Sequence, residues 1–330
     1  MDNLLKQKTD LFIENRNRMA QAFKWSSNLM NLSSAYLFTT AEREVDADAM
    51  KAAEAIVKQE TGAFSAFRGN VRLPLLAKMV LSGQPDNYLA KVTRMYDLLK
   101  QRKWQFTGDY SVLAAMVLAD NLGDRDPEAL VDRVQTSFND MKAKHPWLTS
   151  NEDLITAALL ATTEADPTAL TDEAERNHTI LKQAFRNSNA VQSLSHVLAL
   201  GEAPAEAKCA RVVNIFEGLK SKGHKYSTAY QLPALGTLAL LDVPEDQLVD
   251  EIIAVDDYLA DHKGFGDLAL GSPMRRMYAA QIVLNHQVAS SARSEALVLG
   301  SMVAFTTAMQ MASMTAMLTA VIVTTTMLNN

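Results

Sequence analysis

The chain has 330 residues and a formal net charge of −6, and 48% of its residues are hydrophobic, which excludes a disordered chain and allows a sizeable core. Acids and bases are mixed along the sequence, so the charge predicts no nucleic-acid partner. The single cysteine, Cys209, excludes an intramolecular disulfide, as is usual in a reducing cytoplasm.

Segment 1–62 predicts three helices that cap the rest of the chain, with Asp46 or Asp48 as the N-cap of the third. The opening MDNLLKQKTDLF has no basic start followed by a long apolar run, so it is not a secretory signal. We therefore expect a cytoplasmic protein.

A nearly charge-free segment then recurs along the chain. LLAKMVLSG from Leu75 aligns without a gap with VLAAMVLAD from Val112. Weaker copies begin at Ile155, Ser193, Ala234 and Tyr278. Scarce Gly and Pro with plentiful Ala, Leu and Met favour helix, so each copy predicts a buried helix A.

A proline follows each of the first five copies, and the spacing from one of these prolines to the next is nearly regular. Proline suits the first turn of a helix, and the acids that follow complement the positive end of the helix dipole. Each proline therefore predicts the first turn of a second, amphipathic helix B. The five are Pro85, Pro127, Pro167, Pro204 and Pro244.

Helix B closes in most copies with a basic residue and then an aromatic: Trp104, Trp147, Tyr226 or Phe265. We expect the cation to face the negative end of the dipole and the aromatic to pack under the next hairpin. The fold class is therefore all-α, with five and a half tandem α-hairpins of about 40 residues over 63–291. The period leaves open an α-solenoid or a closed α/α toroid.

Residues 292–330 form an apolar C-terminal segment, without charge from Ala296 to Asn330. Repeated threonines dilute it, and it has no Trp or Tyr to anchor at a membrane interface. We expect 296–326 to form one or two helices packed on the protein's own core. A membrane tail or a homo-oligomer interface is the alternative.

Several longer motifs carry a family resemblance. They are TGAFSAFRGN from Thr61, NAVQSLSHVLAL from Asn189, KGHKYSTAYQLPALGTLALLDV from Lys222 and DDYLADHKGFG from Asp256. Together they resemble the bacterial domain-of-unknown-function family 4003. The resemblance implies a cytoplasmic bacterial protein and supplies no catalytic residues.

Motifs for phosphate binding, zinc binding and a nucleophile elbow are absent, so we predict no cofactor and no metal. The acids Asp256, Asp257 and Asp261 have the spacing DDxxxD and occur once, which indicates a solvated helical face. His196 lies within an otherwise charge-free helix A, and a hydrogen-bonded core histidine is the simplest interpretation.

The loops that join helix B to the next helix A mix aromatics with Asn, Asp, Ser and Arg, a composition typical of recognition surfaces. Turn chemistry alone would also explain it. We expect the arginines there to be exposed, anion-pairing residues. The candidate binding residues are Phe67, Arg68, Asp109, Asn189, Tyr230, Arg275 and Arg276.

These features favour a scaffold that binds a protein or peptide partner. The alternative is an enzyme whose site lies in the central cavity of a toroid, with His196, Tyr230 and Arg275 in acid–base or anion-binding roles. The repeat pattern does not decide between them, because function depends on the site and not on the fold.

Overall fold

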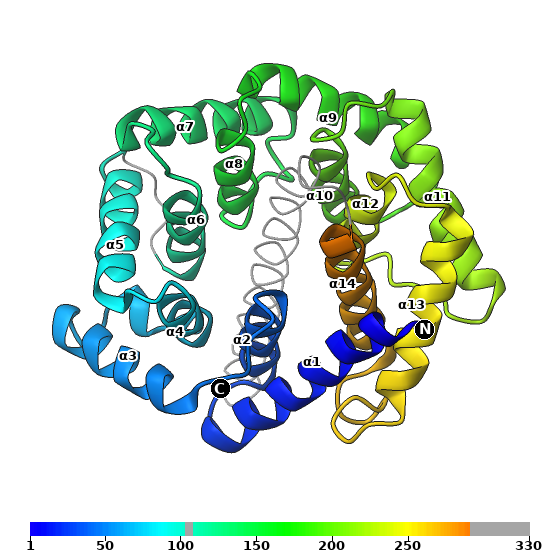
Figure 1. Cartoon of the computed structure of the whole chain (residues 1–330). Helices are drawn as coiled ribbons and strands as arrows, with labels where there is room; N and C mark the ends of the chain where they lie inside the picture. The colour runs from blue at the N-terminus through cyan, green and yellow to red at the C-terminus, as the bar shows by residue number, and fades with distance from the viewer. Residues whose placement is uncertain (103–107, 291–330) are drawn as a thin grey trace, which may run out of the picture. The chain divides into compact units, whose positions relative to one another are not determined.

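A computed structural model describes residues 1–102 and 108–290, and over these residues the chain is all-α (Figure 1). The helices are α1 (Asn3–Ala22), α2 (Asn28–Thr40), α3 (Ala47–Glu60), η1 (Ala66–Arg68), α4 (Arg72–Leu81), α5 (Pro85–Gln101), α6 (Asp109–Asp120), α7 (Pro127–Lys144), α8 (Asp153–Ala161), α9 (Pro167–Leu181), α10 (Ser188–Leu198), α11 (Ala205–Ser221), α12 (Pro233–Ala239), α13 (Glu245–Ala260) and α14 (Ser272–Ser290). The all-α prediction is confirmed.

The described residues divide into two compact units. The first unit comprises residues 14–102 and 108–167, and the second comprises 1–13 and 168–290. Each unit is described by itself below. The predicted division into 1–62, 63–291 and 292–330 stays a prediction.

Buried and amphipathic helices alternate along the chain. All nine residues of α8 and all seven of α12 are buried, whereas α5 buries six of its 17. In the first unit α6 packs against α5 and α8, and in the second α12 packs against α10 and α11. We call the even-numbered helices the buried helices and the odd-numbered ones the surface helices; the charge-free segments are buried, as predicted.

The prolines begin the surface helices. Pro85, Pro127 and Pro167 are the first residues of α5, α7 and α9. Pro204 and Pro244 lie one residue earlier, at the N-caps of α11 and α13. The prediction is confirmed for three prolines and misses by one position for the other two. In either place the missing N–H removes no helical hydrogen bond.

The amino-terminal region forms the three predicted helices, α1 to α3. Asp46 is the N-cap of α3, where its side chain accepts a hydrogen bond of 2.9 Å from Ala49 N. The alternative residue, Asp48, instead pairs with Lys51 at 3.1 Å.

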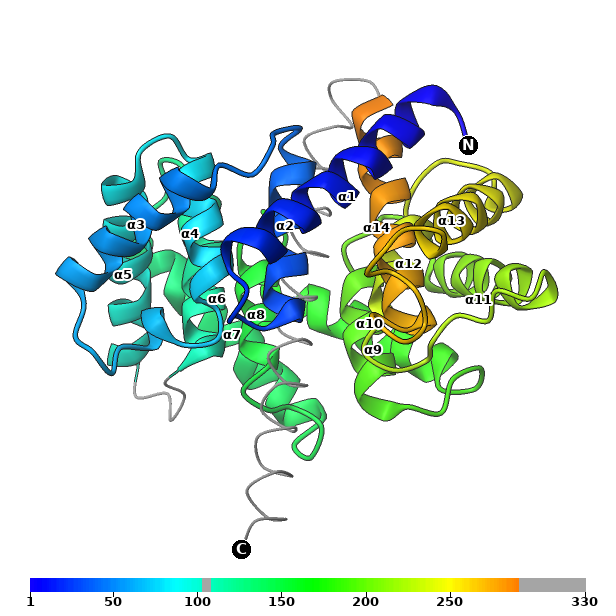
Figure 2. The ribbon, with the colours of Figure 1, turned by 90° about the horizontal axis from the view of Figure 1, so that it is seen from below.

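Because successive helices run in opposite directions, the connections alternate between two edges of each unit (Figure 2). We call the connections from a surface helix to the next buried helix entry loops. They include 23–27, 61–71 and 145–152 in the first unit and 182–187, 222–232 and 261–271 in the second. Exit loops lead from a buried helix to the next surface helix.

Two arginines on surface helices bind the ends of buried helices in the same way. Arg133 on α7 donates to the carbonyl oxygens of Ala161, Thr163 and Ala165, which lie 28, 30 and 32 residues ahead. Arg211 on α11 repeats these three bonds at the same separations, to Ala239, Leu241 and Val243. Each guanidinium satisfies carbonyl groups that the end of the helix leaves without partners.

In the hairpin between these two, α9 and α10, a lysine takes the role of the arginine. Glu173 on α9 precedes Gly201 by the same separation that Arg133 has from Ala161. The buried Lys208 bridges Glu173 and Gly201, with bonds of 2.8 Å to the Glu173 carboxylate and to the Gly201 carbonyl. The cation comes from α11, and it satisfies the carbonyl of Gly201, three residues past the end of α10.

The predicted helices at 296–326 lie outside the described residues. Within 1–102 and 108–290, no helix is long and apolar enough to cross a membrane.

We predict that Arg133→Ala lowers the free energy of unfolding by about 1–3 kcal/mol, because several carbonyl groups lose a charged donor. Arg133→Lys should recover only part of this, since an ammonium group lacks the planar fork. Urea denaturation followed by circular dichroism measures the change.

Arg94→Ala is the matched control, because Arg94 is an exposed residue on a neighbouring surface helix. Its effect should stay within about 0.5 kcal/mol. Equal stability of the Arg133→Ala and Arg94→Ala proteins would show that the carbonyl contacts contribute little.

Candidate functional site

Large hydrophobic side chains are exposed at one kind of connection. Beyond Met1 and Leu4 near the amino terminus, all such side chains in the described residues lie in entry loops. They are Trp25 (100% exposed), Phe64 (104%) and Trp147 (96%) in the first unit, and Tyr230 (42%) and Leu268 (107%) in the second. Of these, only Tyr230 was among the binding residues predicted from the sequence, and Trp147 was expected to be packed.

The loop that carries Trp147 is anchored on both sides of the indole. Lys142 Nζ donates to the carbonyl oxygens of Pro146 at 2.7 Å and Thr149 at 2.8 Å. Thr149 Oγ1 donates to Met141 O, and Ser150 N donates to Asp153 Oδ2 at 2.8 Å. The backbone therefore holds the indole in solvent instead of leaving it on a loose loop.

The expectation that the closing aromatics are packed in the interior holds for Tyr226 (1% exposed) and for Phe265 (0%), whose ring lies 5.6 Å from that of Phe12 in α1. It is wrong for Trp147, whose loop bonds direct the side chain outward. Trp104 lies outside the described residues.

In entry loop 61–71 the exposed side chain is Phe64, and the predicted binding residues have structural roles. Phe67 is buried and its ring packs 5.1 Å from that of Tyr96. Arg68, expected to be exposed, is half-buried and donates to the backbone carbonyls of Lys58 and Thr61 at the end of α3. The orphan carbonyls of a helix end account for this role.

Asp109, at the start of α6, connects this loop to the next hairpin. Its Oδ2 accepts a hydrogen bond of 2.8 Å from Asn70 Nδ2. A Cβ on Gly69 would lie 2.5 Å from Asp109 Oδ1, so a larger residue there would displace the Asp109 carboxylate. The interaction fixes the two segments against each other.

The prediction that Arg275 and Arg276 are exposed and free to bind an anion is wrong. Arg275 is only 7% exposed, and its Nε donates to Asp256 Oδ1 at 2.7 Å. Arg276 Nε donates to Asp256 Oδ2 at 2.9 Å. Burial would lower the pKa of Arg275, but its bonds to Asp256 and Asp267 outweigh burial and raise the pKa above its ordinary value.

The DDxxxD spacing predicted a solvated helical face, and for Asp256 this prediction is wrong. Its side chain is 1% exposed, whereas that of Asp257 is 66% exposed. Two guanidinium groups and His224 Nδ1, at 2.9 Å, share the Asp256 carboxylate. A buried charge of this kind requires such partners.

His224, Asp256 and Asp257 offer ligand atoms close enough together for a metal ion. The chemistry of the group argues against one, because both oxygens of Asp256 already accept from arginine. A divalent cation there would also lie beside two positive charges. The arrangement instead fastens entry loop 222–232, α13 and α14 together, since Arg276 Nη1 also donates to Lys225 O at 2.6 Å.

The remaining candidates are separate from this cluster. His196 is 4% exposed on α10, and its Nδ1 lies 2.8 Å from Gln192 O of its own helix. This bears out the interpretation as a hydrogen-bonded core histidine. Tyr230 is exposed in entry loop 222–232, and Asn189 is exposed in the first turn of α10.

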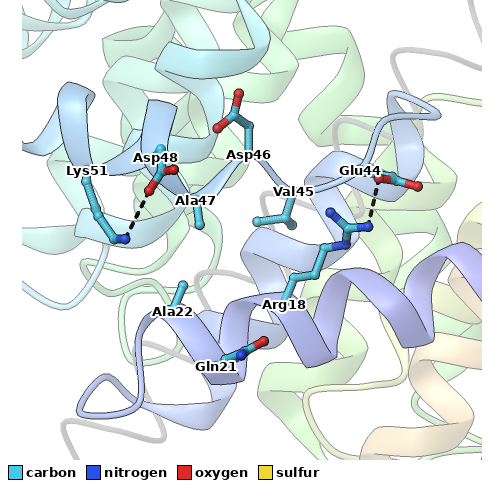
Figure 3. A pocket seen from close by; sticks show the side chains of 9 residues that line it. All are labelled: Arg18, Gln21, Ala22, Glu44, Val45, Asp46, Ala47, Asp48 and Lys51. Atoms are coloured by element: carbon cyan, nitrogen blue, oxygen red, sulfur yellow. Dashed lines mark hydrogen bonds and ion pairs between the residues drawn. The ribbon is translucent and has the colours of Figure 1, made fainter.

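A polar groove of about 650 Å³ lies between the end of α1 and the start of α3 in the first unit (Figure 3). Its cations are already paired, Arg18 with Glu44 at 2.8 Å and Lys51 with Asp48 at 3.1 Å. The carboxylate of Asp46 caps α3. With these groups engaged, the groove offers no aligned nucleophile, base or free anion site.

We predict that Asp256→Asn lowers the free energy of unfolding by about 3 kcal/mol or more, because it removes the buried carboxylate that Arg275 and Arg276 share and leaves Arg275 only the exposed Asp267 as a counterion. Asp257→Asn is the matched control at the adjacent exposed position and should change stability by less than about 0.5 kcal/mol. Chemical denaturation of both proteins tests this, and similar effects would contradict the assigned role of Asp256.

Asp153, which accepts a hydrogen bond from the loop of Trp147, should make the stability of the fold depend on pH. Burial raises the pKa of this carboxyl group to about 7, so the folded state retains a proton that the unfolded chain has already lost. Stability should therefore fall as pH rises from about 4 through about 7. Asp153→Asn should be more stable than the parent at pH 8, by about 2–4 kcal/mol, and equal to it near pH 4.

Asn retains an oxygen to accept from Ser150 N, so the loop should keep its shape. Asp97→Asn, at an exposed position of α5, is the control and should show no such dependence. Denaturation midpoints of the three proteins, measured across this pH range, test the prediction. A parent protein that gains stability toward pH 8 would contradict the role assigned to Asp153.

A model of the family described as a protein of unknown function, DUF4003, matches residues 15–325. No curated protein and no solved structure matches the chain. The matched residues span nearly the whole sequence and include the resembling motifs, so the chain belongs to the DUF4003 family.

Proposed function

We propose that this protein is a helical scaffold whose entry loops bind a protein or peptide partner. The observation that carries the proposal is that, apart from Met1 and Leu4, the large hydrophobic side chains exposed among residues 1–102 and 108–290 lie in entry loops. Trp and Tyr are the residues that most often dominate protein interfaces. Exposed aromatic side chains in water lower solubility unless a partner covers them.

The loops also have the rigidity that a recognition surface requires. Hydrogen bonds around Trp147 and the Arg68 bonds behind Phe64 order the backbone before any partner arrives. Pre-organised side chains lose less conformational entropy on binding. This makes the same edge suitable for a specific contact.

We propose further that the helix pairs are structural repeats of about 40 residues, in an α-solenoid or a closed α/α toroid. The identical separations of the Arg133 and Arg211 contacts support a repeated unit. A cytoplasmic location, with one cysteine and no disulfide, is part of the same proposal.

The enzyme alternative gains nothing from two of its three candidates. Arg275 is engaged by Asp256 and Asp267, and His196 is bound to its own helix. Binding therefore accounts for more of the exposed chemistry than catalysis does.

The proposal predicts cross-links from entry loops and not from the opposite edge of the same unit. A photo-reactive phenylalanine analogue would replace Trp25, Phe64 or Trp147 in separate full-length proteins, each incubated with extract of the organism that encodes the chain. Matched controls carry the analogue at Asp86 or Asp124, which are exposed near exit loops.

We expect the same protein to be captured from the three entry-loop positions and from neither control, as identified by mass spectrometry. Serine at the same three positions should leave the thermal midpoint unchanged, because the side chains are fully exposed. Equal capture from both edges, or none from either, would overturn the proposal.

A further inference from the structure

Charge in the second unit is separated between its two edges. Exit segments 199–206 and 240–246 contain acids and neither Lys nor Arg. The acids are Glu202, Glu206, Asp242, Glu245 and Asp246. The entry loops contain mostly bases, namely Lys182, Arg186, Lys222, Lys225 and Lys263, against Asp261 and Asp267.

The separation has a physical cause. Acids are favourable at the start of a helix and cations at its end. Each surface helix begins after an exit loop and ends before an entry loop, so the helix starts lie at the exit loops and the helix ends at the entry loops. A chain with a net charge of −6 thus carries a locally positive edge.

Most of these cations are available to a partner. Lys222 pairs with Asp250, and Asp267 is neutralised by Arg275. Lys182, Arg186, Lys225 and Lys263 are exposed, and no ion pair is found for them within the described residues. Against these four cations the same loops hold one exposed acid without an ion pair among the described residues, Asp261, so the edge is locally positive.

Contacts connect the three loops that hold these cations. Phe185 of loop 182–187 packs against Phe216 near the end of α11, with ring centroids 5.2 Å apart. Arg276 donates to Lys225 O of loop 222–232, and Arg275 donates to Phe265 O of loop 261–271 at 3.1 Å. The cations and the exposed Tyr230 and Leu268 therefore lie on consecutive, mutually braced segments.

We propose that this entry edge of the second unit binds an acidic segment of a protein partner, one in which Asp or Glu residues flank an apolar side chain. Its carboxylates pair with Lys182, Arg186, Lys225 and Lys263, and its apolar side chain covers Leu268 and Tyr230. The inference rests on the proposed binding function and adds the chemistry of the partner.

A short acidic segment fits this edge better than an extended anionic surface does. The field of the positive edge is screened within about 8 Å at physiological salt. A small ligand bound there is therefore attracted by this edge and is little affected by the negative charge elsewhere on the chain. A nucleic acid or an anionic membrane extends beyond that range and also meets the overall negative charge of the chain.

The test is to pan a displayed library of random short peptides against the full-length protein and to measure binding of an enriched, labelled peptide by fluorescence anisotropy. We expect enrichment of Asp and Glu beside an apolar residue. The charge reversal Lys225→Glu with Lys263→Glu should weaken binding roughly tenfold or more, with a smaller effect at high salt. Glu202→Lys with Asp242→Lys, at the opposite edge, should not weaken it.

Tyr230→Ser with Leu268→Ser separates the two proposals. Neutral or basic peptides that lose affinity in this variant but not in the charge reversal would overturn the acidic partner and leave the binding function standing. If no peptide is enriched, or if none of the variants changes affinity, the binding function of this edge fails as well.

Two further probes address other anions. Vesicles of phosphatidylserine in phosphatidylcholine and a single-stranded DNA oligonucleotide are titrated with the same proteins. Tighter binding to either than to the enriched peptide, lost on charge reversal at Lys225 and Lys263, would assign the edge to lipid or nucleic acid and overturn the proposal.

Discussion

The structure depends on how the ends of its buried helices are satisfied. Local hydroxyl and amide groups satisfy some of their last carbonyls: Thr162 and Thr163 donate to Leu159 O and Leu160 O at the end of α8, and Asn121 donates to Val117 O at the end of α6. Arg133 and Arg211 supply donors from the neighbouring surface helices with the same spacing, and Lys208 does so at Gly201. Donors of both kinds reduce the cost of burying the polar ends of these helices against the hydrophobic core.

This arrangement determines where charge can lie. Buried helices carry few charged residues, such as Asp109, Asp153 and Arg275, so the surface helices and the loops hold most of the charge. The dipole of each surface helix favours acids at its start and bases at its end. Entry loops follow these helix ends, and they expose Trp25, Phe64 and Trp147 in one unit and Leu268 in the other.

Local patterns predicted the local features well. The charge-free segments, the helix-starting prolines and the Asp46 cap depend on neighbours within one helical turn. Asp256 could not be predicted in this way, because its burial depends on Arg275 and Arg276, 19 and 20 residues further along the chain. Trp147 and Tyr226 occupy similar sequence positions, yet their exposure differs because the surrounding loops are bonded differently.

A fully exposed tryptophan on an ordered backbone is informative about function. Burying such a side chain stabilises a folded chain by about 2–3 kcal/mol, so a sequence selected for stability alone would cover it or replace it. Around Trp147 four hydrogen bonds instead order the loop that keeps the indole in water. The indole thus adds no burial free energy to the fold, although hydrogen bonds order the loop that carries it. This combination is expected of a surface that another molecule covers.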